Sequence, residues 1–60
     1  MTLTKKLRRN IGKFVAVFEP AEEGGYVVSV PMLHGCHTQG ETLNEAMMNV
    51  KEAIEVYLLP

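Results

Sequence analysis

The 60-residue sequence has a single cysteine, Cys36, and no tryptophan. One cysteine excludes a disulfide within the chain, and the lack of a disulfide framework favours a reducing compartment. No apolar run approaches the roughly 18 residues that a membrane-spanning helix needs. The apolar run at residues 14–18 is also too short for the core of a secretory signal peptide. We therefore expect a cytoplasmic protein that does not enter a membrane.

The length and composition predict one small folded domain. With 47% hydrophobic and 22% charged residues, the composition is ordinary for a globular chain. A chain of this size buries only about 60% of the surface that its unfolded form exposes, so its core is thin. Self-association is one of the usual ways to reinforce such a core.

The net charge of −1 conceals an uneven distribution, because the basic residues gather near the N-terminus and the seven glutamates all follow residue 18. We divide the chain into a basic arm, residues 1–11, and a domain, residues 12–60. We expect the arm to be solvated and partly ordered, with a short helix or a strand extension as alternatives. The basic residues that could contact nucleic acid are Lys5, Lys6, Arg8 and Arg9. No aromatic residue is interleaved among them to stack on bases.

Residues 40–59 carry the strongest periodic pattern and predict an amphipathic helix. Thr42 and Glu45 form a T-x-x-E capping box, in which each side chain would accept a hydrogen bond from the backbone N–H of the other residue. The apolar residues at three- and four-residue spacing, which predict the buried stripe, are Leu43, Ala46, Met47, Val50, Ala53, Ile54, Tyr57 and Leu58.

Three short segments upstream are typical of β-strands. Residues 12–19 and 26–30 are rich in valine and aromatic residues, and the intervening glycines predict an antiparallel hairpin. Residues 36–39 are a candidate third strand at the edge of the sheet. The expected fold class is therefore α+β, with a three-stranded antiparallel sheet and one helix packed on one face.

Side chains of the hairpin alternate between two faces, and both faces carry apolar residues. Phe14, Ala16 and Phe18 share one face, whereas Val15 and Val17 share the other. One helix covers only one face. We therefore expect a second copy of the chain or a partner to cover the other face, with self-association as a dimer or a tetramer.

The sequence resembles the HicB-like antitoxin family over residues 12–58. The resemblance lies in residues 25–31 (GYVVSVP), Leu33, residues 35–36 (GC), Thr38, residues 40–43 (GETL), residues 45–46 (EA) and residues 53–55 (AIE). It implies a partial RNase H-like fold, self-association, and binding to a small HicA-like ribonuclease toxin, which it silences. Met32 stands where the family usually has an acidic residue, and His34 where it usually has a second proline.

The resemblance also sets expectations about nucleic acid and catalysis. Most full-length antitoxins of this kind carry a DNA-binding domain and one more strand after the helix, but this sequence stops at Pro60. We therefore expect no DNA binding by this chain alone. An RNase H-like nuclease clusters carboxylates around two metal ions, and this sequence has no aspartate. We predict neither enzymatic activity nor catalytic residues, and no cofactor.

His34, Cys36 and His37 are three potential metal ligands within four residues. Structural zinc sites normally need four ligands, at spacings such as C-x-x-C and H-x-x-x-H. In an extended segment Cys36 and His37 also point to opposite faces. The interpretation that we favour is a buried Cys36 that packs as a small hydrophobic residue, with the two histidines in a partly solvated loop.

The outer side of the predicted helix offers a candidate surface for a partner protein. Met48, Glu52, Glu55, Val56 and Leu59 fall opposite the buried stripe. Such an acidic, partly apolar surface suits a basic, RNA-binding toxin. The first functional hypothesis is an antitoxin that covers the active site of a HicA-like toxin that cleaves mRNA. The alternative is a stand-alone, homo-oligomeric domain that binds RNA or protein through the basic arm.

Overall fold

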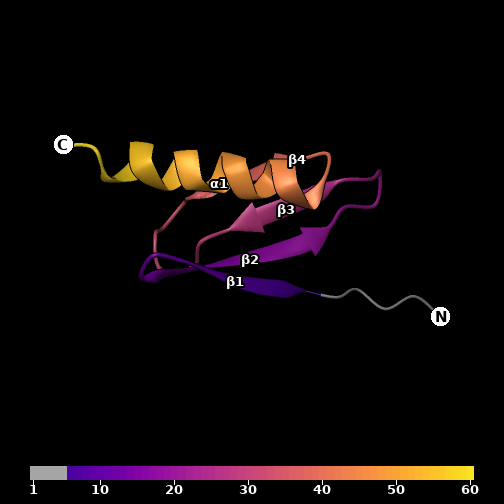
Figure 1. Cartoon of the computed structure of the whole chain (residues 1–60), viewed down its shortest axis with the longest axis horizontal. Coiled ribbons are helices and arrows are strands. Elements are labelled where there is room, and N and C mark those ends of the chain that lie inside the picture. The colour runs from indigo at the N-terminus through magenta and orange to yellow at the C-terminus, as the bar shows by residue number, and fades with distance from the viewer. Residues whose placement is uncertain (1–5) are drawn as a thin grey trace.

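The computed structural model describes residues 6–60, which form a four-stranded antiparallel sheet and one helix (Figure 1). The elements are β1 (Leu7–Ile11), β2 (Phe14–Pro20), β3 (Tyr26–Ser29), β4 (His37–Gly40) and α1 (Leu43–Leu58). The strand order β1-β2-β3-β4 follows the chain, so each strand pairs with its sequence neighbour. The predicted α+β class and antiparallel sheet are confirmed. The predicted number of strands was wrong, because the sheet has four.

The additional strand, β1, lies within the segment that we expected to be a partly ordered arm. The two-residue turn Gly12-Lys13 places Ile11 opposite Phe14 and returns the chain antiparallel to itself. Gly12 has φ 61°, and a two-residue hairpin turn of this kind needs positive φ at its first central residue. Of the alternatives for the arm, the strand extension is therefore correct for Leu7–Ile11. Lys5 lies outside the described residues.

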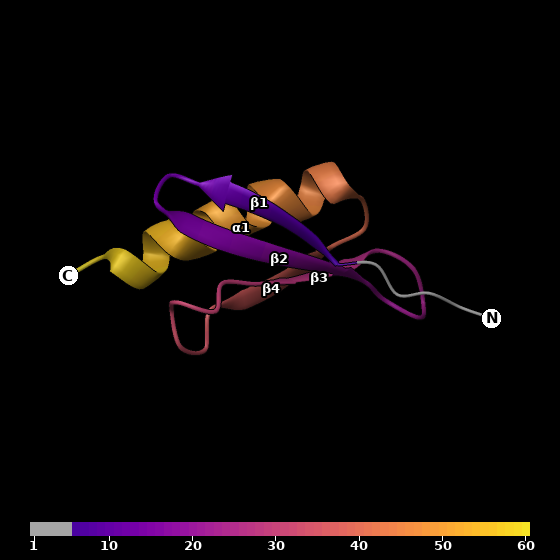
Figure 2. The ribbon, with the colours of Figure 1, turned by 90° about the horizontal axis from the view of Figure 1, so that it is seen from below.

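The core lies between the sheet and α1. It consists of Ala16, Phe18, Val28, Val30, Cys36, Ala46, Val50 and Ile54. These residues confirm that one face of the hairpin and the centre of the helical stripe are buried. α1 packs mainly on β4 and β3, and less on β2. Seen from below, α1 crosses the direction of the strands obliquely (Figure 2). A helix is about 10 Å wide and neighbouring strands are about 4.8 Å apart, so one helix covers about two of the four strands.

The C-terminal turn of α1 extends beyond the ends of β3 and β4 (Figure 1). Tyr57 and Leu58, which the periodicity assigned to the buried stripe, are therefore 45% and 54% exposed. The prediction was wrong for these two residues because the stripe is longer than the sheet beneath it.

The outer face of the sheet, opposite α1, is mixed in polarity. Val15 and Val27 are 41% and 40% exposed on this face, and Val17 is half-buried. The polar and charged residues that share the face by the strand register are Arg8, Asn10, Glu19, Ser29, His37 and Gln39. The two central strands thus contribute an apolar centre, as expected, but polar groups from the outer strands and from the ends of the central strands surround it.

The start of α1 is fixed to the end of β4. The Thr42 hydroxyl accepts a hydrogen bond from the Glu45 N–H over 3.0 Å, which confirms the predicted cap. The Glu45 carboxylate accepts from the Glu41 N–H over 2.6 Å instead of from Thr42, so the reciprocal bond was predicted one residue too late. Gly40 lies directly against the backbone of Ala46, which leaves no room for a Cβ atom.

Candidate functional site

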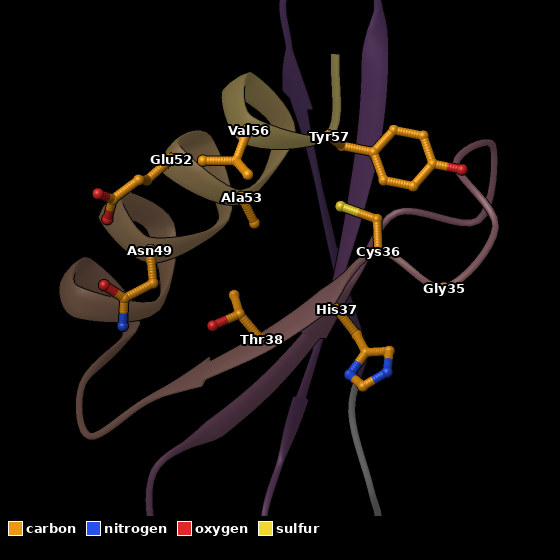
Figure 3. A pocket seen from close by; sticks show the side chains of 9 residues that line it. All are labelled: Gly35, Cys36, His37, Thr38, Asn49, Glu52, Ala53, Val56 and Tyr57. Carbon is orange, nitrogen blue, oxygen red and sulfur yellow. The ribbon is translucent and has the colours of Figure 1, made fainter. Parts of the chain in front are cut away.

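An open groove runs between β4 and α1 and has a volume of about 390 Å³ (Figure 3). We call it the β4 groove. Its lining residues are Gly35, Cys36, His37, Thr38, Asn49, Glu52, Ala53, Val56 and Tyr57. The floor is the edge strand β4, one wall is the side of α1, and Tyr57 stands at the end near the Gly35 loop (Figure 3). The groove therefore combines an apolar end with a polar and acidic middle.

The backbone of β4 gives the groove hydrogen-bonding capacity. Val30 N–H donates to the Cys36 carbonyl over 3.0 Å, and in an antiparallel ladder such pairs alternate along the strand. Thr38 therefore faces Val28, whereas the N–H and C=O groups of His37 and Gln39 point away from β3. Within residues 6–60 no further strand pairs with this edge of β4.

One of these outward-facing groups has a partner. The Asn49 side-chain amide donates to the Gln39 carbonyl oxygen over 2.7 Å and ties α1 to the edge strand. Sequence reasoning missed Asn49, Thr38 and Tyr57 as components of a site. No motif marks them, because they come together only when α1 lies along β4.

The potential metal ligands do not converge. Cys36 is buried with its sulfur directed toward α1, whereas the His37 ring points away from the helix on the outer face (Figure 3). His34 is exposed in the loop before β4. In the described part of the chain no three histidine, cysteine or acidic side chains gather in a metal-binding geometry. Cys36 therefore packs as a small hydrophobic residue.

The proposed partner surface on the outer side of α1 is accessible. Met48 and Val56 are 66% and 62% exposed, and Leu59, just after the helix, is 67% exposed. Glu52 and Glu55 are exposed between them. Val56 and Glu52 also line the β4 groove, so the outer side of α1 and the groove form one continuous surface.

The basic residues of the N-terminal segment do not share one surface. Arg8 pairs with Val17 on the outer face, whereas Arg9 pairs with buried Ala16 on the face that carries α1. Lys6 Nζ lies 3.3 Å from Glu19 Oε2 in an exposed ion pair. Because neighbouring residues of a strand point to opposite faces, β1 divides the charges that the sequence presents as a cluster.

Comparison with known proteins assigns the chain to a family. The model of the HicB-like antitoxin of bacterial toxin–antitoxin systems matches residues 14–59. The chain belongs to the HicB-like antitoxin family. β1 precedes the part of this HicB-like antitoxin domain that the family model matches.

Similar proteins of this family occur in archaea and bacteria. A UPF0150 protein of Archaeoglobus fulgidus is 61% identical over 46 residues, which are 77% of this chain and 67% of the relative. A UPF0150 protein of Synechocystis is 45% identical over 58 residues, which are 97% of this chain and 70% of the relative. This second match includes the segment that forms β1. A UPF0150 protein of Thermoplasma acidophilum is 50% identical over 46 residues, which are 77% of this chain and 67% of the relative.

No solved structure matches this chain significantly, so the RNase H-like character of the fold remains an expectation from the sequence. Among residues 6–60, α1 is neither long nor apolar enough to cross a membrane.

Proposed function

We propose that this HicB-like antitoxin domain neutralises a HicA-like toxin that cleaves mRNA, by binding the toxin and covering its active site. The role is that of a binding protein, without chemistry of its own. The contact surface is the outer side of α1, formed by Met48, Glu52, Glu55, Val56 and Leu59.

One observation carries this proposal: α1 exposes large apolar side chains between carboxylates. Met48, Val56 and Leu59 are each more than 60% exposed, and Glu52 and Glu55 lie among them. A protein that binds RNA presents a basic surface, so opposite charge would accelerate its encounter with α1. The exposed apolar residues would then supply contact area once the two surfaces meet.

A charge-reversal experiment tests this surface. Glu52→Lys with Glu55→Lys should slow association with a HicA-like toxin encoded beside this gene by at least about tenfold at low salt. The matched control is Glu22→Lys with Glu23→Lys in the turn between β2 and β3, which makes the same change in net charge on exposed residues. The control variant should bind with a smaller loss of rate.

Different failures of this experiment have different meanings. If the unmodified chain does not bind the toxin, the antitoxin function itself is refuted. If the unmodified chain binds but the rate and its salt dependence are the same in the α1 variant, the toxin is bound by another surface. Nuclease assays on the complex then test whether binding blocks the toxin's active site.

We also propose that the chain self-associates as a dimer or a tetramer. Val15 and Val27 are about 40% exposed at the centre of the outer face, where a second copy would cover them. Sedimentation of the unmodified chain at micromolar concentration tests this directly. A folded species that remains at 6.7 kDa would contradict the proposal.

A further inference from the structure

The sheet has two free edges among the described residues, and they carry opposite charge. β1 forms one edge and carries Arg8 and Arg9, both exposed. β4 forms the other edge, with Glu52 above it in the β4 groove and Glu41 directly after it in the chain. The molecule therefore has a basic strand edge and an acidic strand edge.

Like β4, β1 has backbone N–H and C=O groups that point away from the sheet and can pair with another strand. Ile11 and Phe14 flank the two-residue turn, and the residues that flank such a turn form a hydrogen-bonded pair. By the alternation of the ladder, the N–H and C=O groups of Arg8 and Asn10 point away from β2. They match the outward-facing groups of His37 and Gln39 on β4. The Gln39 carbonyl oxygen already accepts from Asn49, and its second lone pair would accept from the added strand.

We propose that β1 of one copy adds to β4 of the next copy as an antiparallel strand, so that copies join head to tail through their oppositely charged edges. This inference concerns a contact between copies of the chain and does not rest on the toxin hypothesis. It is also separate from the association through the outer face, because it uses the strand edges and the β4 groove.

The side chains agree with this pairing. In the register that sets Arg8 opposite Gln39 and Asn10 opposite His37 of the next copy, Arg9 lies opposite Thr38. Arg9 and Thr38 both belong to the faces that carry α1, so the Arg9 guanidinium enters the middle of the β4 groove beside Glu52.

The same register suits the apolar end of the groove. Ile11, on the same face as Arg9, falls opposite Cys36, where Val56 and Tyr57 form the wall. Val56 and Tyr57 are 62% and 45% exposed in the single chain. The pairing therefore buries apolar surface that α1 leaves open at its C-terminal turn.

The charges favour this head-to-tail pairing over the symmetric pairing of two β4 edges or of two β1 edges. Two β4 edges related by a two-fold axis would bring Glu52 of one copy toward Glu52 of the other. Two β1 edges would bring arginines together. Like charges opposed across paired strands are destabilising, whereas opposite charges stabilise the pair. A head-to-tail contact leaves one free edge at each end, so further copies can add.

Proline substitutions test the proposal, because proline is tolerated in a strand where its missing N–H would face away from the sheet. Gln39→Pro removes an outward N–H from β4 and leaves β1 intact. Asn10→Pro removes an outward N–H from β1 and leaves β4 intact. Each variant is labelled with a fluorophore and titrated with unlabelled copies of itself and of the other, up to about 1 mM to capture weak association. Circular dichroism and thermal melting check that both variants fold.

The expected result is that the mixed titration shows binding at least about tenfold tighter than either self-titration, and that it stops at one copy of each. Equal binding in all titrations overturns the proposal, because association through the outer face would behave in this way. Binding of Asn10→Pro to itself would indicate a symmetric β4 contact and also overturns it. No association of the unmodified chain overturns it as well.

A charge exchange keeps the proposal testable if a proline variant does not fold. Arg9→Glu and Glu52→Arg each place like charges at the proposed contact, so each variant should associate with itself at least about tenfold more weakly than the unmodified chain. Mixing the two variants restores opposite charge at both contacts between unlike copies, with the original Arg9–Glu52 pair at one and the reversed pair at the other. The mixture should recover the lost association, and a mixture no tighter than either variant alone overturns the proposal.

Discussion

Asn49 fastens the helix to the edge of the sheet, because its side-chain amide donates to the Gln39 carbonyl oxygen over 2.7 Å. In the described part of the chain it is the one side-chain hydrogen bond that joins α1 to a strand. Asn49→Ala should lower the free energy of unfolding by about 1 kcal/mol, since water can replace the lost donor at this open edge. Urea denaturation measures the change.

Asn44 provides a control for the substitution of Asn49. It is exposed in the first turn of α1. Asn44→Ala should leave stability unchanged or raise it slightly, because alanine favours the helix more than asparagine. Equal losses at both positions would show that the bond to Gln39 contributes nothing.

The cap of α1 should be worth a measurable amount of stability. Thr42→Ala removes the acceptor for the Glu45 N–H and should cost about 1 kcal/mol of unfolding free energy. Thr42→Ser keeps the hydroxyl and should restore most of that loss. Thermal melts of the three proteins at the same concentration provide the comparison, and a serine variant as unstable as the alanine variant would contradict the capping role.

Substitution by alanine should reduce stability by different amounts at two glycines, Gly40 and Gly12. At Gly40 the new Cβ would lie 2.7 Å from the Ala46 Cα atom, so the start of α1 must move away from β4. We expect a loss of about 3 kcal/mol, at the upper end of typical overpacking costs. At Gly12 nothing lies within 4 Å, and only the positive φ opposes alanine, at a cost of about 1 kcal/mol. Chemical denaturation distinguishes the two costs, and equal values would contradict the close approach at Gly40.

Val27 and Val28 are adjacent in β3 but face opposite sides of the sheet. Val28 is fully buried and Val27 is 40% exposed. Val28→Ser should lower the unfolding free energy by about 3 kcal/mol, through lost apolar burial and a buried hydroxyl. Val27→Ser should cost less than about 1 kcal/mol in the monomer.

The same pair reports on association through the outer face. If a second copy covers that face, the difference in stability between the unmodified chain and the Val27→Ser variant should increase with protein concentration, because only the unmodified chain gains from association. Denaturation midpoints at several concentrations measure this effect. Midpoints of both proteins that do not depend on concentration would exclude a stabilising contact there.

The sequence predicted the elements whose signals are local. The capping residues and the three- and four-residue spacing located α1, and the alternation of Phe14, Ala16 and Phe18 identified the buried face of β2. It failed at β1, because Leu7–Ile11 is basic with few apolar residues. That segment becomes a strand through its pairing with β2. The Gly12-Lys13 turn could have indicated a hairpin between β1 and β2, but the charged residues around it favoured a solvated arm.

The candidate site was less predictable than the fold. Glu52 and Val56 were identified from helical geometry alone, since their exposure follows from the position of the buried stripe. The β4 groove depends on backbone groups of His37 and Gln39, and side-chain patterns contain no information on which way a carbonyl points. The exposure of Tyr57 could not be predicted from the sequence either, because it depends on where the strands beneath α1 end.

Because α1 covers β3 and β4 more than β1 and β2, the two halves of the sheet should differ in their free energy of local unfolding. β1 is joined through its pairing with β2, and its five residues contribute none of the fully buried side chains. Peeling β1 away would therefore leave the packing of α1 on β3 and β4 undisturbed. Amide protons of β1 should exchange with solvent through this local opening, which needs little free energy. Amide protons of β3 should exchange only when the whole domain unfolds.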